Sequence, residues 1–108
     1  MPNYRNATTG SIDANGESVG IAYRHFLNGG VGVQIVGTFV GTLTFEGTIN
    51  GTDYDDISAE EVGSLAVSTQ ATTTGLYKFD AVGLKAVRVR ATAWTSGTAE
   101  IAIAAMEG

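Results

Sequence analysis

The chain has 108 residues, no cysteine, and eleven acidic against six basic residues, which give a net charge of -5. This is the length of one domain, able to bury roughly two-thirds of its unfolded surface. The lack of cysteine excludes disulfides and thiolate-bound zinc or iron–sulfur clusters, and the negative charge disfavours binding to nucleic-acid phosphates. Since no apolar stretch is long enough to span a bilayer, we expect neither a nucleic-acid nor a membrane partner.

Fifteen glycines and a single proline accompany abundant threonine, valine and alanine. Threonine and valine are stiff at χ1 and favour strands, while frequent glycine supplies turns and bulges. No window keeps apolar residues at i, i+3, i+4 and i+7 for long, so helices are not expected. The composition therefore predicts an all-β chain.

The first part of the chain is polar, rich in Gly, Asn, Ser and Thr, and has no hydrophobic period. We expect residues 1–18 to form an extended N-terminal arm, and residues 19–108 to form a single β-sandwich domain. Within that domain, residues 19–26 and 31–38 predict the first two strands.

A clear alternation follows over residues 39–49. Its two faces are made by Phe39, Leu43 and Phe45 on one side and by Thr42, Thr44 and Glu46 on the other. The Asn50-Gly51 pair is a strong signal for a type I′ hairpin turn, because that turn needs positive φ at both central residues. Residues 54–57 would then return as a short strand.

The next segment contains short strands between turns. We expect residues 58–63 to form a loop or a single helical turn, and residues 65–69 to form a strand. Residues 75–82 predict another strand, with Tyr77 and Phe79 on one face.

The last quarter, residues 85–106, reads KAVRVRATAWTSGTAEIAIAAM and alternates on both sides of a Thr-Ser-Gly-Thr segment. A period of two places successive side chains on opposite faces of a sheet, so the two runs predict strands joined by a hairpin turn. In the first run, one face carries Val87, Val89, Ala91 and Ala93, and the opposite face carries Arg88, Arg90, Thr92 and Trp94. In the second run, the apolar face continues with Ile101, Ile103 and Ala105. In all, about seven to nine short antiparallel strands predict a β-sandwich of jelly-roll type.

Few residues point to catalysis. His25 is the only histidine, no cysteine is available as a nucleophile, and no serine lies in a nucleophile-elbow pattern. A lone histidine is far more often a packing or surface residue than a general base. We expect no enzymatic activity, no catalytic residue, and neither a cofactor nor a metal site.

An acidic segment contains Asp53, Asp55, Asp56, Glu60 and Glu61. Loops rich in carboxylates bind Ca²⁺, but glycine and glutamate are misplaced here for an EF-hand loop. A solvated loop that discourages edge pairing is the favoured interpretation, with calcium binding as the alternative.

Arg88, Arg90 and Trp94 share one face of their strand, and three interpretations follow. The arginines pair across strands with a carboxylate such as Glu46 or Glu100. Alternatively, the face is a subunit interface, where Trp, Tyr and Arg are enriched, or it binds sugar through stacking and planar hydrogen bonds. Cross-strand or intersubunit pairing is favoured over sugar binding.

Three segments together resemble a group of small phage and prophage structural proteins. They are GTLTFEGTINGTDY at residues 41–54, GLYKF at residues 75–79, and residues 83–101 with Val-Arg-Val-Arg and Thr-Ser-Gly. In that group, which includes head decoration proteins and domains of tail or fibre proteins, such segments are consecutive strands of a compact β-sandwich. Tyr54 departs from the pattern, since a tryptophan is common there.

The resemblance implies a virion structural protein, specifically a capsid decoration (cement) protein that stabilises the outer shell and is assembled in the host cytoplasm. Its expected partners are the major capsid protein or other virion proteins, together with further copies of the chain in a trimer or dimer. We expect the interface to include Tyr4, Arg5, Arg88, Arg90 and Trp94. The alternative is a carbohydrate-binding or tail- or fibre-associated module, with Trp94, Tyr77 or Tyr54 as stacking platforms.

Overall fold

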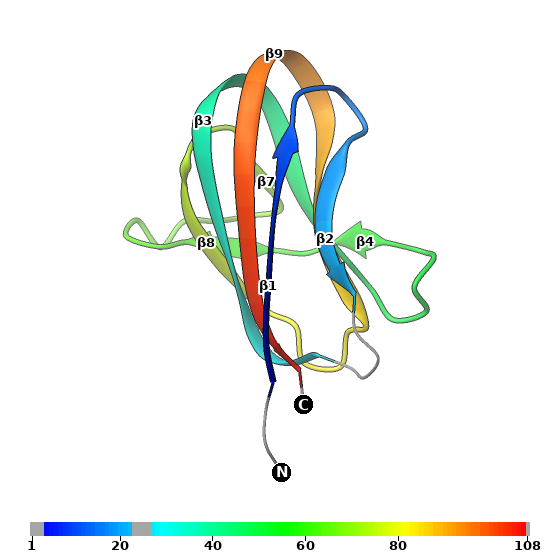
Figure 1. Ribbon diagram of the computed structural model, residues 1–108. Coiled ribbons are helices and arrows are strands. Elements are labelled where there is room, and N and C mark those ends of the chain that lie inside the picture. Colours follow the sequence, from blue (N-terminus) through cyan, green and yellow to red (C-terminus); the bar gives the residue numbers. More distant parts are fainter. Residues whose placement is uncertain (1–3, 23–26, 108) are drawn as a thin grey trace.

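The computed structural model describes residues 4–22 and 27–107, and within them the chain forms strands without any helix (Figure 1). In chain order the strands are β1 (Tyr4–Ile12), β2 (Ser18–Ala22), β3 (Leu27–Thr48), β4 (Asp55–Asp56), β5 (Ala59–Glu61), β6 (Val67–Ser68), β7 (Gln70–Ala71), β8 (Gly75–Asp80) and β9 (Ala86–Glu107). The nine strands in these ranges confirm the all-β class and the expected number of strands. None of the described residues belongs to a helix that could cross a membrane.

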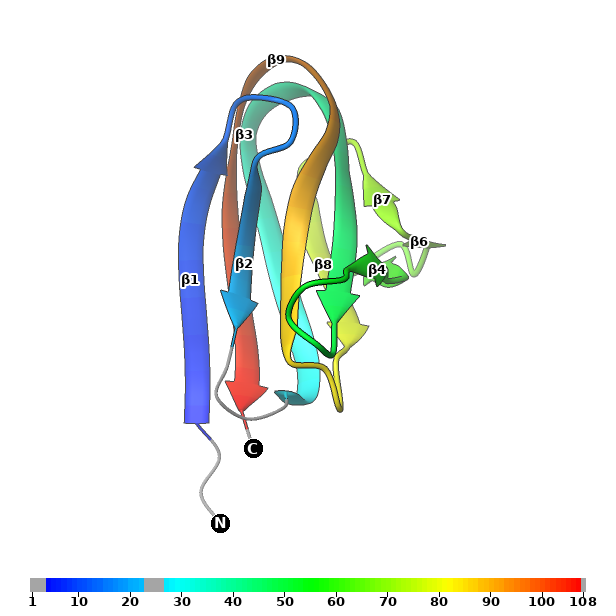
Figure 2. The same ribbon diagram turned by 90° about the vertical axis from the view of Figure 1, so that its right-hand side faces the viewer.

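Two long strands dominate the molecule. β3 and β9 have 22 residues each and pair antiparallel with one another from Val31 opposite Ala105 to Thr48 opposite Ala86. Both bend over together at one end of the molecule (Figures 1 and 2). The hairpin predicted for residues 85–106 is therefore wrong, because each half of β9 pairs with β3 and not with the other half. For the same reason, residues 31–38 and 39–48, expected to form two strands, belong to one bent strand, β3.

Glycines and bulges let the ladder bend without ending. Gly97 has a φ of 88°, and a Cβ atom there would overlap the carbonyl oxygen of Thr38 and lie 2.6 Å from the Cα of Phe39. Thr92 is an extra residue in β9, because Leu43 faces Ala91 while Thr42 faces Ala93. Such a bulge bends its strand and shifts the alternation. Ala93, expected on the inward face beside Ala91, is therefore exposed.

The bend divides the sheet into two layers. The first layer contains β1, residues 97–107 of β9, residues 27–39 of β3, and then β8, β5 and β6. The second layer contains β2, residues 86–94 of β9, residues 41–48 of β3, and the short strands β4 and β7. Figure 2 shows the long strands passing from one layer to the other over the bent end. This is the expected β-sandwich.

Side chains from both layers fill one core. Phe45 of the second layer packs against Tyr77 and Phe79 of the first, with ring centroids 5.3 and 6.0 Å apart. Fully burying an apolar side chain of this kind contributes about 1.5–3 kcal/mol. The predicted inward faces are confirmed by the buried residues Leu43, Phe45, Tyr77, Phe79, Val87, Val89, Ala91, Ile101, Ile103 and Ala105.

The segment expected to be an N-terminal arm, residues 1–18, differs from that expectation. Within it, Tyr4–Ile12 form β1, and all nine residues of this strand pair with β9. The side chain of Ile12 is fully buried. Backbone hydrogen bonds to β9 hold this polar sequence in the sheet whatever its side chains are. The inward positions include Thr8 and Gly10, so no apolar period marks the strand in the sequence.

The connections between strands differ from the expected turns in detail. The β3–β4 loop is longer than a two-residue hairpin: Gly51 has a φ of 85°, but Asn50 does not share this conformation, so the type I′ turn is wrong. Instead, the Asn50 side-chain oxygen accepts hydrogen bonds from the backbone N–H groups of Thr52 and Asp53, each at 2.8 Å. Residues 58–63, expected to be a loop or helical turn, contain β5, which pairs with β8 and β6.

Candidate functional site

The outward side of the second layer gathers the charged residues that the alternation placed opposite the core. Glu46 on β3 faces Arg88 on β9, and Thr44 faces Arg90. Because inward neighbours such as Phe45 and Val89 are buried in the core, these charged side chains point away from it.

One carboxylate accepts hydrogen bonds from two guanidinium groups. Arg88 Nε donates to Glu46 Oε1 at 2.7 Å, while Arg90 donates from Nε to Oε1 at 3.1 Å and from Nη2 to Oε2 at 3.2 Å. The Glu46 side chain is only 6% exposed, against 28% for Arg88 and 37% for Arg90. This confirms the cross-strand pairing with Glu46; the other candidate, Glu100, accepts a hydrogen bond from Ser11 at 2.8 Å.

Tyr54 covers this ion pair from the β3–β4 loop. The guanidinium carbon of Arg88 lies 3.7 Å from the centre of the Tyr54 ring, a cation–π contact. β4 fixes the loop, because Asp56 pairs with Glu46 and Asp55 with Gly47. The alternation of β3 and β9 gave no sign of this role, because Tyr54 lies in the loop between β3 and β4. We call Glu46, Arg88, Arg90 and Tyr54 the Glu46 cluster.

The charges of the Glu46 cluster are fixed at neutral pH. Burial of the Glu46 carboxyl acts to raise its pKa, but the hydrogen bonds and charges of Arg90 and Arg88 outweigh burial and hold the pKa below its ordinary value. The hydrogen bond to Glu46 likewise raises the pKa of Arg90. The cluster therefore offers no proton transfer near pH 7. The guanidinium N–H groups that do not bond to Glu46 are held in place and partly exposed. They can donate hydrogen bonds to carbonyl or carboxylate oxygens of a bound molecule.

This arrangement gives a pH dependence that can be measured. The folded protein lowers the pKa of Glu46 below its ordinary value of 4.5. The ionised Glu46 carboxylate therefore stabilises the folded state fully above its ordinary pKa. This stabilisation is lost as the pH falls through the lower pKa that Glu46 has in the folded protein. Between pH 6 and pH 3, we expect the melting temperature of the wild-type protein to fall further than that of the Glu46→Gln variant, by calorimetry. Parallel curves for the two proteins would contradict this coupling.

Trp94 lies at the bent end of the sheet and serves packing there. Its ring stacks on Phe39 with centroids 5.2 Å apart and planes 7° apart, and its Nε1 donates to the Gly97 carbonyl oxygen at 3.2 Å. A Cβ atom at Gly41 would overlap the Trp94 ring, so the missing side chain makes room for it. One face of the indole is thus used internally, and the ring is half-buried.

The aromatic residues considered as sugar platforms do not form one surface. Tyr77 is 7% exposed and packs in the core, with its hydroxyl donating to the Thr73 carbonyl oxygen at 3.1 Å. The prediction that Tyr77 is a surface platform for a sugar is therefore wrong. The Tyr54 ring face contacts the Arg88 guanidinium, and Trp94 stacks on Phe39.

Three of the five acidic residues at 53–61 take separate partners. Asp53 accepts a hydrogen bond from Asn50 at 2.8 Å, Glu60 pairs with Lys78 at 3.5 Å, and Glu61 accepts one from Ser64 at 2.6 Å. In residues 4–22 and 27–107, no three acidic or histidine side chains gather as a metal site would require.

The remaining candidate residues are only partly described. Tyr4 and Arg5 lie in β1 opposite Glu107 and Met106, but their side chains are outside the description. His25, the one imidazole considered for catalysis, lies outside the described residues.

No protein-family model and no curated protein matches the sequence. Among solved structures, the SPBc2 prophage-derived protein YomS is similar over 99% of this chain and 96% of its own, with a TM-score of 0.74 and 17% sequence identity. The PBSX exported protein XepA has a TM-score of 0.75 and 16% identity over 95% of this chain. The matched region is 38% of XepA, so the chain corresponds to a part of that longer protein. At such identities the likeness establishes the fold.

Proposed function

We propose that the protein is a non-enzymatic structural component of a phage virion, and that it binds the outer surface of the capsid as a decoration protein. The observation that carries the proposal is the match to YomS, a protein whose name describes it as prophage-derived, over nearly the whole length of both chains. The three sequence segments that resemble phage structural proteins support it independently. Together they favour a phage-associated structural protein.

The Glu46 cluster suits binding to a partner protein. Glu46 orients both guanidinium groups before any partner arrives, so little side-chain entropy remains to be lost on binding. The partly exposed guanidinium groups can donate to carbonyl or carboxylate oxygens on a capsid surface. Binding to the assembled shell alone stabilises the shell by mass action, and many copies add their effects.

An alternative placement in the virion has its own support. The fold occurs as 38% of XepA, which is the arrangement expected of a module within a longer chain. This favours, as the second candidate, a tail- or fibre-associated module over a free sugar-binding protein, because the aromatic side chains are engaged internally.

Binding to capsids tests the decoration function. Purified protein is expected to sediment with expanded capsids that lack it, and the double variant Arg88→Lys/Arg90→Lys to bind at least tenfold more weakly. Lysine keeps the charge beside Glu46 but loses the planar fork of donors. Lys85→Ala, an exposed residue outside the cluster, serves as the control and should bind normally. Wild-type protein that stays in the supernatant would reject capsid decoration, and labelling of tails in electron micrographs would favour the alternative.

A further inference from the structure

Two loops of the protein carry the same pair of residues, an exposed asparagine followed by a glycine with positive φ. Asn15-Gly16 lies in the β1–β2 loop and Asn50-Gly51 in the β3–β4 loop, and the φ angles of the two glycines are 88° and 85°. An asparagine is labile before glycine, because no side chain on the next residue shields the backbone nitrogen that attacks the amide. In a third pair, at residues 28–29, the asparagine side chain lies outside the description.

The reaction at such a pair is deamidation. The backbone nitrogen of the glycine attacks Cγ of the asparagine and gives up its proton, which forms a succinimide ring. The side-chain nitrogen takes up that proton, and its bond to Cγ breaks, so that it leaves as ammonia. Water then adds to either ring carbonyl carbon and opens the ring, which leaves aspartate or isoaspartate. The ring closes only when Cγ stands over the glycine nitrogen, so hydrogen bonds that hold these groups elsewhere slow the reaction.

The side chain of Asn50 is held at both of its polar atoms. Its Oδ1 accepts hydrogen bonds from the N–H groups of Thr52 and Asp53 at 2.8 Å each and from the Thr48 hydroxyl at 3.1 Å. Its Nδ2, the leaving group, donates to Asp53 Oδ2 at 2.8 Å. The attacking nitrogen is held as well, because the Gly51 N–H donates to Thr48 Oγ1 at 3.1 Å. Several of these bonds must open together before the ring can close.

The side chain of Asn15 is less constrained. The hydrogen bonds described in the β1–β2 loop belong to its backbone and to Glu17, whose carboxylate accepts two backbone N–H groups, and none of them involves the Asn15 side chain. The attacking Gly16 N–H makes one described bond, to the Ala91 carbonyl oxygen at 2.8 Å. A Cβ atom at Gly16 would have no neighbour within 4 Å, so the space beside the attacking nitrogen is open. Opening of a single described hydrogen bond therefore frees this pair to react.

We propose that Asn15 is a site of spontaneous deamidation in the folded protein, and that the hydrogen bonds of the β3–β4 loop protect Asn50 from the same reaction. Each hydrogen bond that must open first slows ring closure by up to about tenfold. Because several such bonds hold the Asn50 pair and one holds the Asn15 pair, we expect Asn15 to react at least about tenfold faster.

The protected asparagine is the one whose loss would reach the Glu46 cluster. Deamidation of Asn50 would replace its Nδ2 donor by a carboxylate oxygen that faces Asp53 Oδ2, so that a hydrogen bond becomes a repulsion between like charges. The same loop places Tyr54 on Arg88. Figure 2 shows the β1–β2 loop at the bent end of the sandwich and the β3–β4 loop toward the other end, so a charge gained at Asn15 leaves the β3–β4 loop intact.

The proposal is tested by incubating the purified protein in mildly alkaline buffer and following each asparagine by mass spectrometry of its proteolytic peptide. In the folded wild-type protein, Asn15 is expected to convert at least about tenfold faster than Asn50. In guanidinium chloride, where the loops no longer exist, the two are expected to convert at similar rates, since both precede glycine. Asn15→Gln should remove the fast reaction of the folded protein, because the longer side chain does not favour ring closure.

Asp53→Ala tests the protection of Asn50 directly. It removes the partner of the leaving group at an exposed position, and it should speed the conversion of Asn50 severalfold while leaving that of Asn15 unchanged. Asp55→Ala removes a neighbouring exposed carboxylate and should change neither rate. Thermal melts check that each variant is folded. No conversion at Asn15 in the folded protein, conversion of Asn50 as fast as that of Asn15, or an Asn50 rate unaffected by Asp53→Ala would overturn the proposal.

Discussion

Replacing Gly97 by alanine is expected to lower the free energy of unfolding by about 3–5 kcal/mol. The residue has a φ of 88°, which disfavours any Cβ atom. That atom would also overlap the Thr38 carbonyl oxygen and lie 2.6 Å from the Cα of Phe39. Both are backbone atoms of β3 at the bend, so relief requires breaking the β3–β9 ladder where the two layers join. Urea unfolding followed by circular dichroism measures the loss.

Gly16 provides a matched control for this effect. It has the same φ of 88°, but a Cβ atom there would have no neighbour within 4 Å. Gly16→Ala therefore reports the cost of the left-handed conformation alone, expected to be about 1–2 kcal/mol. Equal losses for the two variants would mean that backbone conformation, and not overlap with β3, makes glycine necessary at the bend.

Replacing Glu46 by alanine is expected to lower the free energy of unfolding by about 2–4 kcal/mol. Removing one partner of a buried ion pair typically costs about 3–5 kcal/mol, and the partial exposure of Arg88 and Arg90 reduces this figure. The loss arises because two neighbouring guanidinium groups are left without their shared carboxylate. Chemical denaturation at pH 7 provides the measurement.

Glu100→Ala is the natural comparison for Glu46→Ala. Glu100 lies on β9 opposite Val36 of β3, as Glu46 lies on β3 opposite Arg88 of β9, but it is exposed and accepts one described hydrogen bond, from Ser11. Exposed substitutions of this kind usually change stability by less than about 0.5 kcal/mol. If both variants lose the same stability, the Glu46 cluster is a surface ion pair and not a structural element of the second layer.

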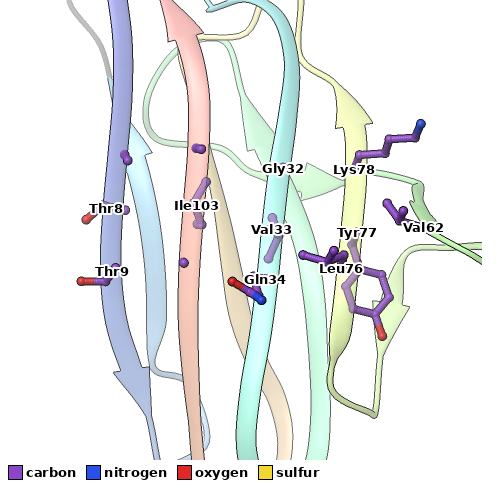
Figure 3. Close-up of a pocket in the computed structure, with 13 residues that line it drawn as sticks. Thr8, Thr9, Gly32, Val33, Gln34, Val62, Leu76, Tyr77, Lys78 and Ile103 are labelled. Atoms are coloured by element: carbon purple, nitrogen blue, oxygen red, sulfur yellow. The ribbon is translucent and has the colours of Figure 1, made fainter.

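The two outward faces of the sandwich differ in chemistry. The second layer presents fixed charges and hydrogen-bond donors, which suit a polar partner surface. Along the shallow groove that crosses β1, β9, β3 and β8, the first layer presents mainly small and apolar side chains (Figure 3). Lys78, the one charged residue that lines this groove in the described ranges, is already paired with Glu60.

The amino-acid sequence by itself determined the class of the fold and the two faces of most strands. The period of two is a property of a single strand, so Val87, Val89, Ile101 and Ile103 could be placed in the core without knowing what they pair with. The same alternation placed Arg88 and Arg90 outward and left Glu46 and Glu100 as possible partners. It failed at β1, where the inward positions are too small or too polar to show a period.

Only the tertiary structure decided which strands pair. A Thr-Ser-Gly-Thr segment is compatible both with a hairpin turn and with the crest of a bend. The choice depends on the facing residues at 38–40, more than fifty positions away in the sequence. Register then selected Glu46 for the two arginines, and the β3–β4 loop placed Tyr54 over them. The physical reason is that side-chain alternation is local, whereas backbone pairing and burial are set by residues that meet only in the folded chain.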